Sequence, residues 1–315
     1  MFHISKNEVA VVSGYNGDDQ PATKAQLSEP SFVVVSSQDN VYISERLNHR
    51  IRKIDRNGMI STICGNGEYG YNGDGILATS AKLRTPWALF VTEDEQVLFC
   101  DRANHRVRKI DRFGMISTIA GNGVAGYNGD DQLAVNAQLS CPSGVFMYKN
   151  EIYIADSDNN RIRKILQNGM ITTLASDTPI HSPSSIFLRN DQLFFTQQLS
   201  HVIMKLFPNG TVARVAGNGK YGYNGDGIPA CSAMISYPSG LFVDGEDQIY
   251  MTSSDGRIRK VDRDGLIQTI GGGDVELHEV EFDFGKWPHV GPRKKEMIKR
   301  FDKAYYDIVF EILEN

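Results

Sequence analysis

The chain of 315 residues is poor in the features that mark several protein classes. Its four cysteines, Cys64, Cys100, Cys141 and Cys231, lack the paired spacing of metal sites and disulfide frameworks, so we expect them to be reduced and mostly buried. No run reaches the roughly 18 apolar residues of a membrane helix, and the N-terminal residues lack the apolar core of a signal peptide. We therefore expect a cytoplasmic protein without a membrane span.

Basic charge is not in excess, because 33 basic and 38 acidic residues give a net charge of −5. No field of the whole molecule would draw it onto nucleic acid, although a local basic face remains open. The nucleophile elbow, the zinc-protease helix motif, the phosphate loop and the dinucleotide fingerprint are all missing. The sequence therefore predicts no enzyme, no catalytic residue, no cofactor and no metal.

The strongest pattern that is present is internal repetition. Residues 51–63 recur as residues 107–119, with the sequences IRKIDRNGMISTI and VRKIDRFGMISTI. One marker glycine recurs at Gly58, Gly114, Gly169, Gly210 and Gly265, and one marker proline at Pro30, Pro86, Pro142, Pro183 and Pro238. Successive markers lie 55 or 56 residues apart, except for one interval of 41. The unit thus has about 41 residues, with an insert in most copies, and a period near 40 is typical of propeller blades.

Each unit has the pattern of four short strands. In the third copy they are the Ile-, Val-, Phe- and Tyr-rich runs 143–148, 151–156, 161–166 and 170–175. No helical pattern separates them, so hairpins should join them into an antiparallel blade. Type I′ turns are predicted between third and fourth strands at Asn57-Gly58, Asn168-Gly169, Asn209-Gly210 and Asp264-Gly265. The sequence predicts an all-β propeller with five complete four-stranded blades.

The segment ahead of each marker glycine resembles a known module. Residues 48–53, 104–109 and 159–164 have the sequences NHRIRK, NHRVRK and NNRIRK, which are similar to NHL repeats. The resemblance covers about residues 8–272 and implies a propeller, while the module occurs in protein-binding domains, RNA-recognition domains and a few lyases. The fourth copy departs from the pattern at Gln197 and Ser200, and the fifth copy is one residue shorter.

The inserts, rich in Gly, Asn, Tyr and Asp, join the last strand of one unit to the first strand of the next. They should lie side by side on one face, where they serve either packing between blades or repeated contacts with a partner. The candidate interaction residues are Tyr71, Asn72, Asp74, Tyr127, Asn128, Asp130, Tyr223, Asn224 and Asp226.

The two ends of the chain leave closure of the ring open. Residues 8–13 match the fourth strand of a unit. Either this strand closes a five-bladed ring, or residues 274–290 help to form an irregular or incomplete sixth blade, or the chain is a fragment of a longer protein. The repeat domain then covers residues 1–273, followed by an extension at 274–315.

Apolar residues at three- and four-residue spacing in this extension predict an amphipathic α-helix at about 293–314. Docking on the propeller, self-association, contact with another protein and binding to a membrane surface all fit such a helix. Its candidate contact residues are Ile298, Phe301, Tyr305, Ile308 and Ile312.

Two further sets of residues recur at equivalent positions. His49, His105 and His201 fall on separate blades, too far apart for a shared metal, so we expect them to make structural hydrogen bonds. Glu45, Asp101 and Asp156 end the second strands, where a carboxylate accepts hydrogen bonds from turn amides. Metal ligands gathered in the channel from several blades would escape a linear search.

Four basic residues lie on the third strands and are candidate nucleic-acid contacts: Arg52, Arg108, Arg163 and Arg259. Together they allow a basic annulus that would bind RNA with a salt-sensitive affinity. The preferred hypothesis is nevertheless a scaffold that binds protein partners or ligands through its repeated loop faces. RNA binding and a propeller lyase or hydrolase with a channel metal are the alternatives.

Overall fold

The computed structural model describes residues 14–272, which form five antiparallel sheets. Blade 1 contains β1 (Gln20–Pro21), β2 (Pro30–Val35), β3 (Val41–Glu45), β4 (Arg50–Ile54) and β5 (Met59–Cys64). Blade 2 contains β6 (Ile76–Leu77), β7 (Pro86–Val91), β8 (Val97–Asp101), β9 (Arg106–Ile110) and β10 (Met115–Ala120). Blade 3 contains β11 (Gln132–Leu133), β12 (Pro142–Tyr148), β13 (Glu151–Asp156), β14 (Arg161–Ile165) and β15 (Met170–Leu174).

Blade 4 has four strands, namely β16 (Pro183–Arg189), β17 (Gln192–Gln197), β18 (Val202–Leu206) and β19 (Val212–Ala216). Blade 5 contains β20 (Ile228–Pro229), β21 (Leu241–Val243), β22 (Ile249–Thr252), β23 (Ile258–Val261) and β24 (Leu266–Gly271). The helices of the described part are three-residue 3-10 turns: η1 (Ala22–Lys24), η2 (Ala78–Ser80), η3 (Arg102–Asn104), η4 (Ala134–Asn136), η5 (Gln198–Ser200) and η6 (Ala230–Ser232). The predicted all-β fold with five blades is confirmed.

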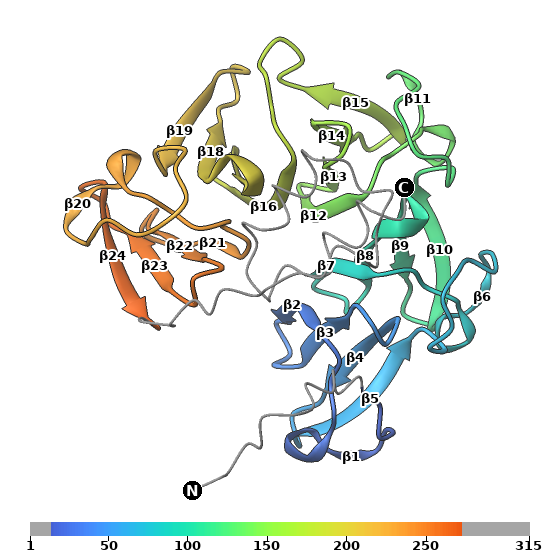
Figure 1. Cartoon of the computed structure of the whole chain (residues 1–315). Coiled ribbons are helices and arrows are strands. Elements are labelled where there is room, and N and C mark those ends of the chain that lie inside the picture. Colours follow the sequence, from blue (N-terminus) through green and yellow to red (C-terminus); the bar gives the residue numbers. More distant parts are fainter. Residues whose placement is uncertain (1–13, 273–315) are drawn as a thin grey trace, which may run out of the picture.

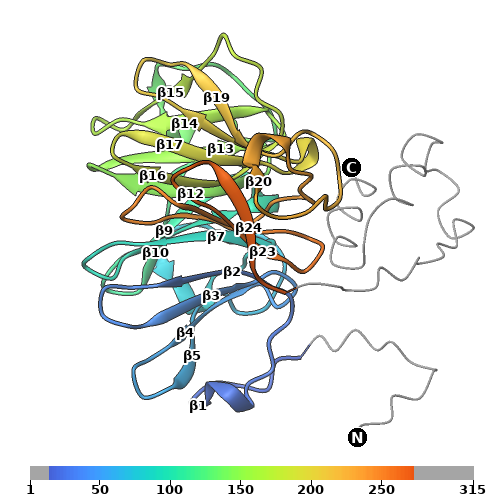
Figure 2. The same ribbon diagram turned by 90° about the vertical axis from the view of Figure 1, so that its left-hand side faces the viewer.

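The blades are arranged around a common centre, with β2, β7, β12, β16 and β21 innermost (Figure 1). From the side, the sheets are stacked face to face (Figure 2). In blades 1, 2, 3 and 5 an insert adds a two-residue strand to the outer edge, as Gln20 pairs with Ile60 in blade 1. Blade 4 lacks this strand because the short 41-residue interval leaves no insert ahead of it.

The turns between third and fourth strands differ from the prediction. The N–H of Gly58 donates to the carbonyl of Asp55, whose own N–H donates to the carbonyl of Met59. Gly58 has φ +76° while Asn57 keeps a negative φ, so the loop is a type I turn followed by a glycine bulge rather than type I′. The Asp55 carboxylate selects it by accepting from the N–H groups of Asn57 and Met59, each at 2.9 Å.

The hydrophobic core is divided among the four contacts between consecutive blades. Each cluster joins one face of a blade to the facing side of the next, as where Ile51 of blade 1 packs with Leu89 of blade 2. The other clusters lie between blades 2 and 3, 3 and 4, and 4 and 5. Three cysteines are buried within or beside these clusters and Cys231 is exposed; all four are free thiols, as expected.

The faces of blades 1 and 5 that would form a fifth such contact are apolar and exposed. Val33 of β2 is 61% exposed, whereas its equivalents Leu89, Val145 and Ile186 are buried. Ile258 of β23 is 44% exposed, whereas the residues at its position in the other four blades, Ile51, Val107, Ile162 and Ile203, have no exposed surface. Among the described residues, the ring therefore has an open cleft between its first and last blades.

Candidate functional site

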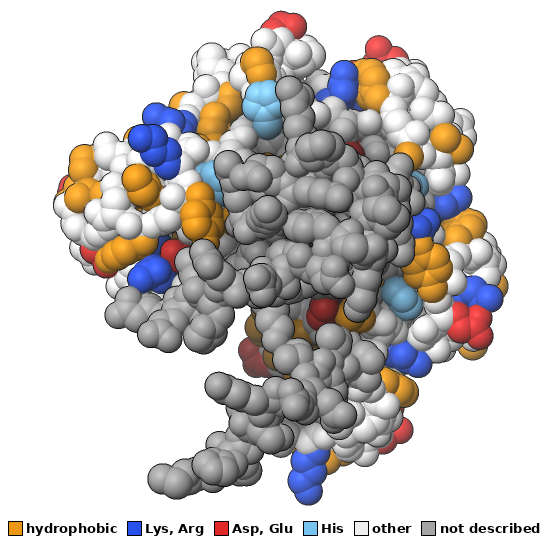
Figure 3. Space-filling model, viewed as in Figure 1, with side chains coloured by type: hydrophobic (Ala, Val, Ile, Leu, Met, Phe, Trp, Pro, Cys, Tyr) orange, Lys and Arg blue, Asp and Glu red, His pale blue; other side chains and the backbone are white. Residues whose placement is uncertain are grey.

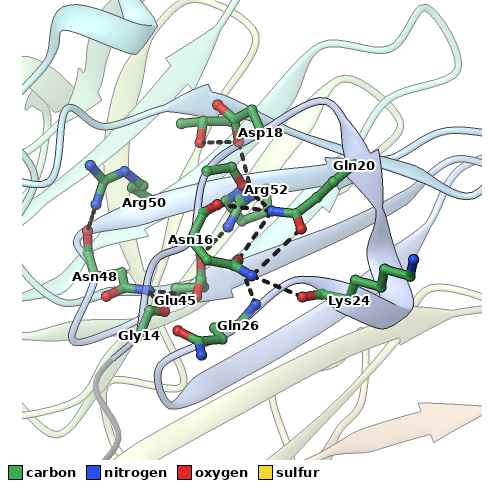
Figure 4. A network of polar contacts seen from close by, with 12 residues as sticks. Gly14, Asn16, Asp18, Gln20, Lys24, Gln26, Glu45, Asn48, Arg50 and Arg52 are labelled. Carbon is green, nitrogen blue, oxygen red and sulfur yellow. Dashed lines mark hydrogen bonds and ion pairs between the residues drawn. The ribbon is translucent and has the colours of Figure 1, made fainter.

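A buried arginine on the third strand ties an insert to its blade, as Figure 4 shows for Arg52 of blade 1. In blade 1, Arg52 donates to the Glu45 carboxylate at 3.1 Å and to Asp18 of the insert at 2.8 Å. Thr62 of β5 donates to the same Asp18 oxygen at 3.0 Å. Arg52 and Glu45 are fully buried, so the insert supplies a second carboxylate to a cation that water cannot reach.

The link from the arginine to the insert aspartate recurs in blades 2, 3 and 5, although in blade 5 the other edge of Arg259 donates to the carbonyl of Met234 at 3.1 Å instead of to a second carboxylate. Equivalent Arg–Asp pairs are Arg108–Asp74, Arg163–Asp130 and Arg259–Asp226, at 2.8, 2.9 and 2.9 Å. In blade 4 the arginine position holds Met204, and the carboxylate position at the end of the second strand holds Gln197.

The four candidate nucleic-acid contacts therefore have a different location from the one the sequence allowed. Arg52, Arg108, Arg163 and Arg259 are almost wholly buried and point into the blades. They therefore do not form an exposed basic annulus. The third strands offer no such surface for binding RNA phosphates.

The predicted interaction residues are engaged in holding their own inserts. The guanidinium of Arg106 lies 3.8 Å from the ring centroid of Tyr71. Asn72 binds the backbone of Ser80 and Lys82. Tyr127 and Tyr223 stack in the same way on Arg161 and Arg257. Asn128 and Asn224 bind their inserts as Asn72 does. The rings of Tyr71, Tyr127 and Tyr223 remain partly exposed, so a partner could still contact them.

The repeated histidines connect one blade to the next. The Nδ1 atoms of His49, His105 and His201 accept hydrogen bonds from the backbone N–H groups of Thr85, Cys141 and Tyr237 at 3.5, 3.2 and 3.3 Å. Burial lowers the pKa of all three imidazoles, which favours the neutral acceptor form.

Blade 3 makes the equivalent link with Asn160, whose Oδ1 accepts from the N–H of Ser182 at 2.8 Å. Histidine side chains are spread around the face in Figure 3. Within residues 14–272, no group of three His, Cys, Asp or Glu side chains is placed to hold a metal.

The carboxylates at the ends of the second strands hold turns and arginines together. Asp101 accepts from the N–H of Arg84 and from Asn104, both at 2.8 Å, and from Arg108 at 3.4 Å. Burial raises the pKa of Asp101 and of Asp156 to about 6, against the lowering effect of these hydrogen bonds. Both lie in the blade interior and neither lines the central cavity described next.

The central cavity opens into the cleft between blades 1 and 5 and has a volume of about 490 Å³. The residue after each marker proline lines it, a serine in four blades and a tryptophan in blade 2: Ser31, Trp87, Ser143, Ser184 and Ser239. Val33, Phe242 and Ile258 line its cleft side. None of the described lining residues carries a charged group.

Sequence reasoning missed this cleft. The signal was available in the register of the repeat, because Val33 and Ile258 occupy positions that pack against a neighbouring blade elsewhere. Trp87 likewise stands out as the one bulky residue among serines, and Arg46 and Arg102 flank its ring at 5.7 and 5.5 Å.

Comparisons with known proteins were made by family, by sequence and by structure. No family model matches the chain. It is 27% identical over 261 residues to the chloroplastic protein SUPPRESSOR OF QUENCHING 1 of Arabidopsis thaliana, covering 79% of this chain and 21% of that protein. It is 30% identical over 173 residues to Teneurin-m of Drosophila melanogaster, covering 50% and 6%. The chain thus spans 21% and 6% of the length of these two relatives.

Solved structures identify the fold. An auxiliary nutrient binding protein from Bacteroides thetaiotaomicron matches with a TM-score of 0.62 at 14% identity, covering 82% of this chain and 61% of that one. Virginiamycin B lyase from Staphylococcus aureus matches with 0.52 at 19%, covering 79% and 71%. A gluconolactonase from Xanthomonas campestris matches with 0.56 at 13%, covering 78% and 76%.

The chain is a five-bladed β-propeller. At these identities the likeness shows the fold alone, and assignment of the blades to NHL repeats stays a prediction. The prediction that the chain is not an enzyme is wrong as an exclusion, because similar propellers include a lyase and a lactonase. Missing linear motifs cannot exclude catalysis on a fold that gathers its side chains from separate blades.

The remaining predictions concern the ends of the chain and its location. The C-terminal helix and the strands considered at 8–13 and 274–290 lie outside the described residues. Within the described residues, no helix has the length and apolar character needed to cross a membrane.

Proposed function

We propose that the protein is a binding propeller that receives a polypeptide partner in the cleft between blades 1 and 5. The observation that carries this proposal is the exposure of Val33 and Ile258. The counterparts of Ile258 in the other blades are buried, and those of Val33 are buried in blades 2, 3 and 4 and half-buried, as Leu241, in blade 5. Exposed apolar side chains that line a common cavity are typical of interaction sites.

The chemistry of the cleft specifies the kind of partner. Its described lining has no charged group, and its two walls are the faces of β-sheets. Elsewhere in the ring such a face packs against another sheet through aliphatic and aromatic side chains, as in the contact between blades 4 and 5. The favoured partner is therefore a hairpin or sheet with an uncharged apolar face.

A photo-crosslinking amino acid at Phe242 tests the proposal in the full chain. With an extract of the source cells, we expect a discrete adduct with a second protein, lost in the Ile258→Asp variant. The same crosslinker at Phe113, which is exposed on the turn between β9 and β10, is the control for random encounters.

Mass spectrometry of the adduct decides the outcome. A partner peptide with an uncharged apolar face supports the proposal. Adducts that map only to residues 1–13 or 273–315 of the chain itself, or that match those of the control position, contradict it.

A further inference from the structure

A second cavity, of about 440 Å³, lies at the outer part of blade 3, where the insert between blades 3 and 4 is missing. Arg161, Tyr127, Asn160 and Asp177 are among its lining residues. It is distinct from the central cavity and has no lining residue in common with it. The equivalent space in blades 1 and 2 is filled by the chain itself.

The filled sites show what the space accepts. In blade 1, Arg50 lies on the Tyr15 ring at 3.9 Å and donates through Nη2 to the backbone carbonyl of Asn66 at 2.9 Å. In blade 2, Arg106 donates to the carbonyl of Asn122, also at 2.9 Å. Both carbonyls belong to Gly-Asn-Gly turns that open the inserts.

These turns need glycine because they pass directly over the arginine. A Cβ atom at Gly67 or Gly123 would overlap the guanidinium of Arg50 or Arg106. Both glycines have φ +90°, which also disfavours a side chain.

Blade 3 retains the receiving half of this contact. Arg161 lies on the Tyr127 ring at 4.0 Å and donates through Nη1 to the carbonyl of Asn159 at 2.7 Å, as its equivalents do. Ser176, Asp177 and Thr178 replace the Gly-Asn-Gly turn, and no bond from Arg161 to a carbonyl of this segment accompanies them among the described residues. The site is a repeat socket without its insert.

We propose that this socket binds a glycine-rich turn of a partner polypeptide, whose backbone carbonyl oxygen accepts a hydrogen bond from Arg161. A neutral carbonyl suits the site better than an anion, because Asp177 lines the same cavity and offsets the charge of Arg161. Asp130, which also lines the cavity, is already paired with Arg163 and Thr173, so it does not compete for the donor groups of Arg161. The volume lies within the range of about 300 to 1,000 Å³ that is usual for ligand sites.

The chain supplies its own test ligand. A synthetic peptide of residues 120–137 contains the turn that binds Arg106 in blade 2. Titrated into the ¹⁵N-labelled full chain, it should shift amide resonances of residues 173–180 in a saturable manner. The Arg161→Gln variant should weaken binding about ten-fold, because a hydrogen bond from a charged donor is lost.

Matched controls separate this site from general stickiness. Arg106→Gln, at a socket that is already filled, should leave peptide affinity unchanged. A peptide with alanine in place of Gly123 should bind more weakly, because φ +90° disfavours alanine and the added Cβ would displace the guanidinium from the carbonyl. Thermal unfolding of each variant checks that the fold is retained.

Three results would overturn the proposal. They are absence of saturable shifts at millimolar peptide, equal binding of the alanine peptide, and shifts at 173–180 produced by acetate or phosphate but not by the peptide. The central cleft plays no part in this experiment, so its outcome is independent of the proposed function.

Discussion

Blade 4 differs from blades 1, 2, 3 and 5 in several positions that are far apart in sequence and change together. The four regular blades bury an arginine, and each receives an aspartate from the insert ahead of it. Blade 4 has no insert ahead of it, and Met204 replaces the arginine. The position of the threonine that holds the aspartate is Arg214, which is exposed.

The comparison teaches that the buried ion network and the insert depend on each other. A buried guanidinium without the aspartate of the insert would lose a charge-paired hydrogen bond. The other edge of the guanidinium is satisfied by a second carboxylate in blades 1, 2 and 3 and by the carbonyl of Met234 in blade 5. Replacing one partner of such a group is costly, whereas replacing the group as a whole with apolar residues is often neutral. In blade 4 the members differ together: Met204 replaces the arginine, Gln197 the strand-end carboxylate and Arg214 the threonine, and the insert aspartate is absent.

The largest expected effect comes from giving a regular blade only part of the blade 4 pattern. Arg108→Met should destabilise the fold by about 3 to 5 kcal/mol, because Asp101 loses its buried ion partner. Urea unfolding measures the loss, with Met204→Leu as a control expected within about 1.5 kcal/mol. Adding Asp101→Gln, the residue type at position 197, should recover part of the stability. Equal losses in Arg108→Met and the control would contradict this account.

A smaller loss of stability should separate the insert after blade 2, which covers Arg106, from the insert after blade 4, which covers no arginine. Gly123→Ala should cost about 2 kcal/mol, because φ is +90° and because the Cβ would displace the Arg106 guanidinium from the Asn122 carbonyl. Gly219→Ala changes the same motif after blade 4, where φ is +85° and the nearest atom is 3.9 Å away. It should cost only about 1 kcal/mol, the penalty of the backbone conformation. Differential scanning calorimetry that ranks the pair in reverse would show that the arginine does not limit the space.

Removing one hydrogen bond from the network should have a still smaller effect. Thr118→Val deletes the 3.0 Å bond to Asp74 and should cost about 1 kcal/mol in chemical denaturation. Arg214→Ala, at the equivalent and exposed position of blade 4, should change stability by less than about 0.5 kcal/mol. Similar values for the two variants would mean that Thr118 adds nothing to the aspartate pair.

The smallest effect concerns the links between blades and depends on pH. The lowered pKa of His49, His105 and His201 means that the folded state binds fewer protons than the unfolded state. This stabilisation is present above the ordinary pKa of about 6.5 and is lost as the pH falls through the lower folded value. Below pH 6.5 we expect a loss of up to about 1 kcal/mol per histidine.

Blade 3 provides the variant for this test, because Asn160 makes the same link without titrating. Replacing all three histidines by asparagine should preserve the fold and flatten the stability profile between pH 7 and 5. Comparing both proteins at each pH cancels the opposite contribution of Asp101 and Asp156, whose raised pKa favours stability at lower pH. Identical slopes would show that the imidazoles are not the acceptors.

The sequence predicts the architecture well because spacing carries it. The recurring prolines and glycines mark strand ends through the local sequence alone. Their intervals give five units. The turn type was missed because Asn57-Gly58 fits two geometries, and the side chain of Asp55 decides between them. That decision depends on a hydrogen bond, which a dipeptide signal does not contain.

The candidate site was harder to predict because the burial and pairing of its residues depend on neighbours that are close in space and distant in sequence. Strand alternation places either Arg52 or Lys53 toward the interior, but Asp18, which pairs with Arg52, is 34 residues away. An exposed basic ring and a buried network therefore look alike in the sequence. The cleft depends on which blade faces have a partner, and that is a property of the assembled ring.

The division of the apolar core into separate contacts between blades has a consequence for how the molecule opens. Blades 2, 3 and 4 are each held from both sides, whereas blades 1 and 5 are held from one side among the described residues. Like the last members of a stack, the two outer blades should fray first, and their amide protons should exchange with solvent before those of blade 3.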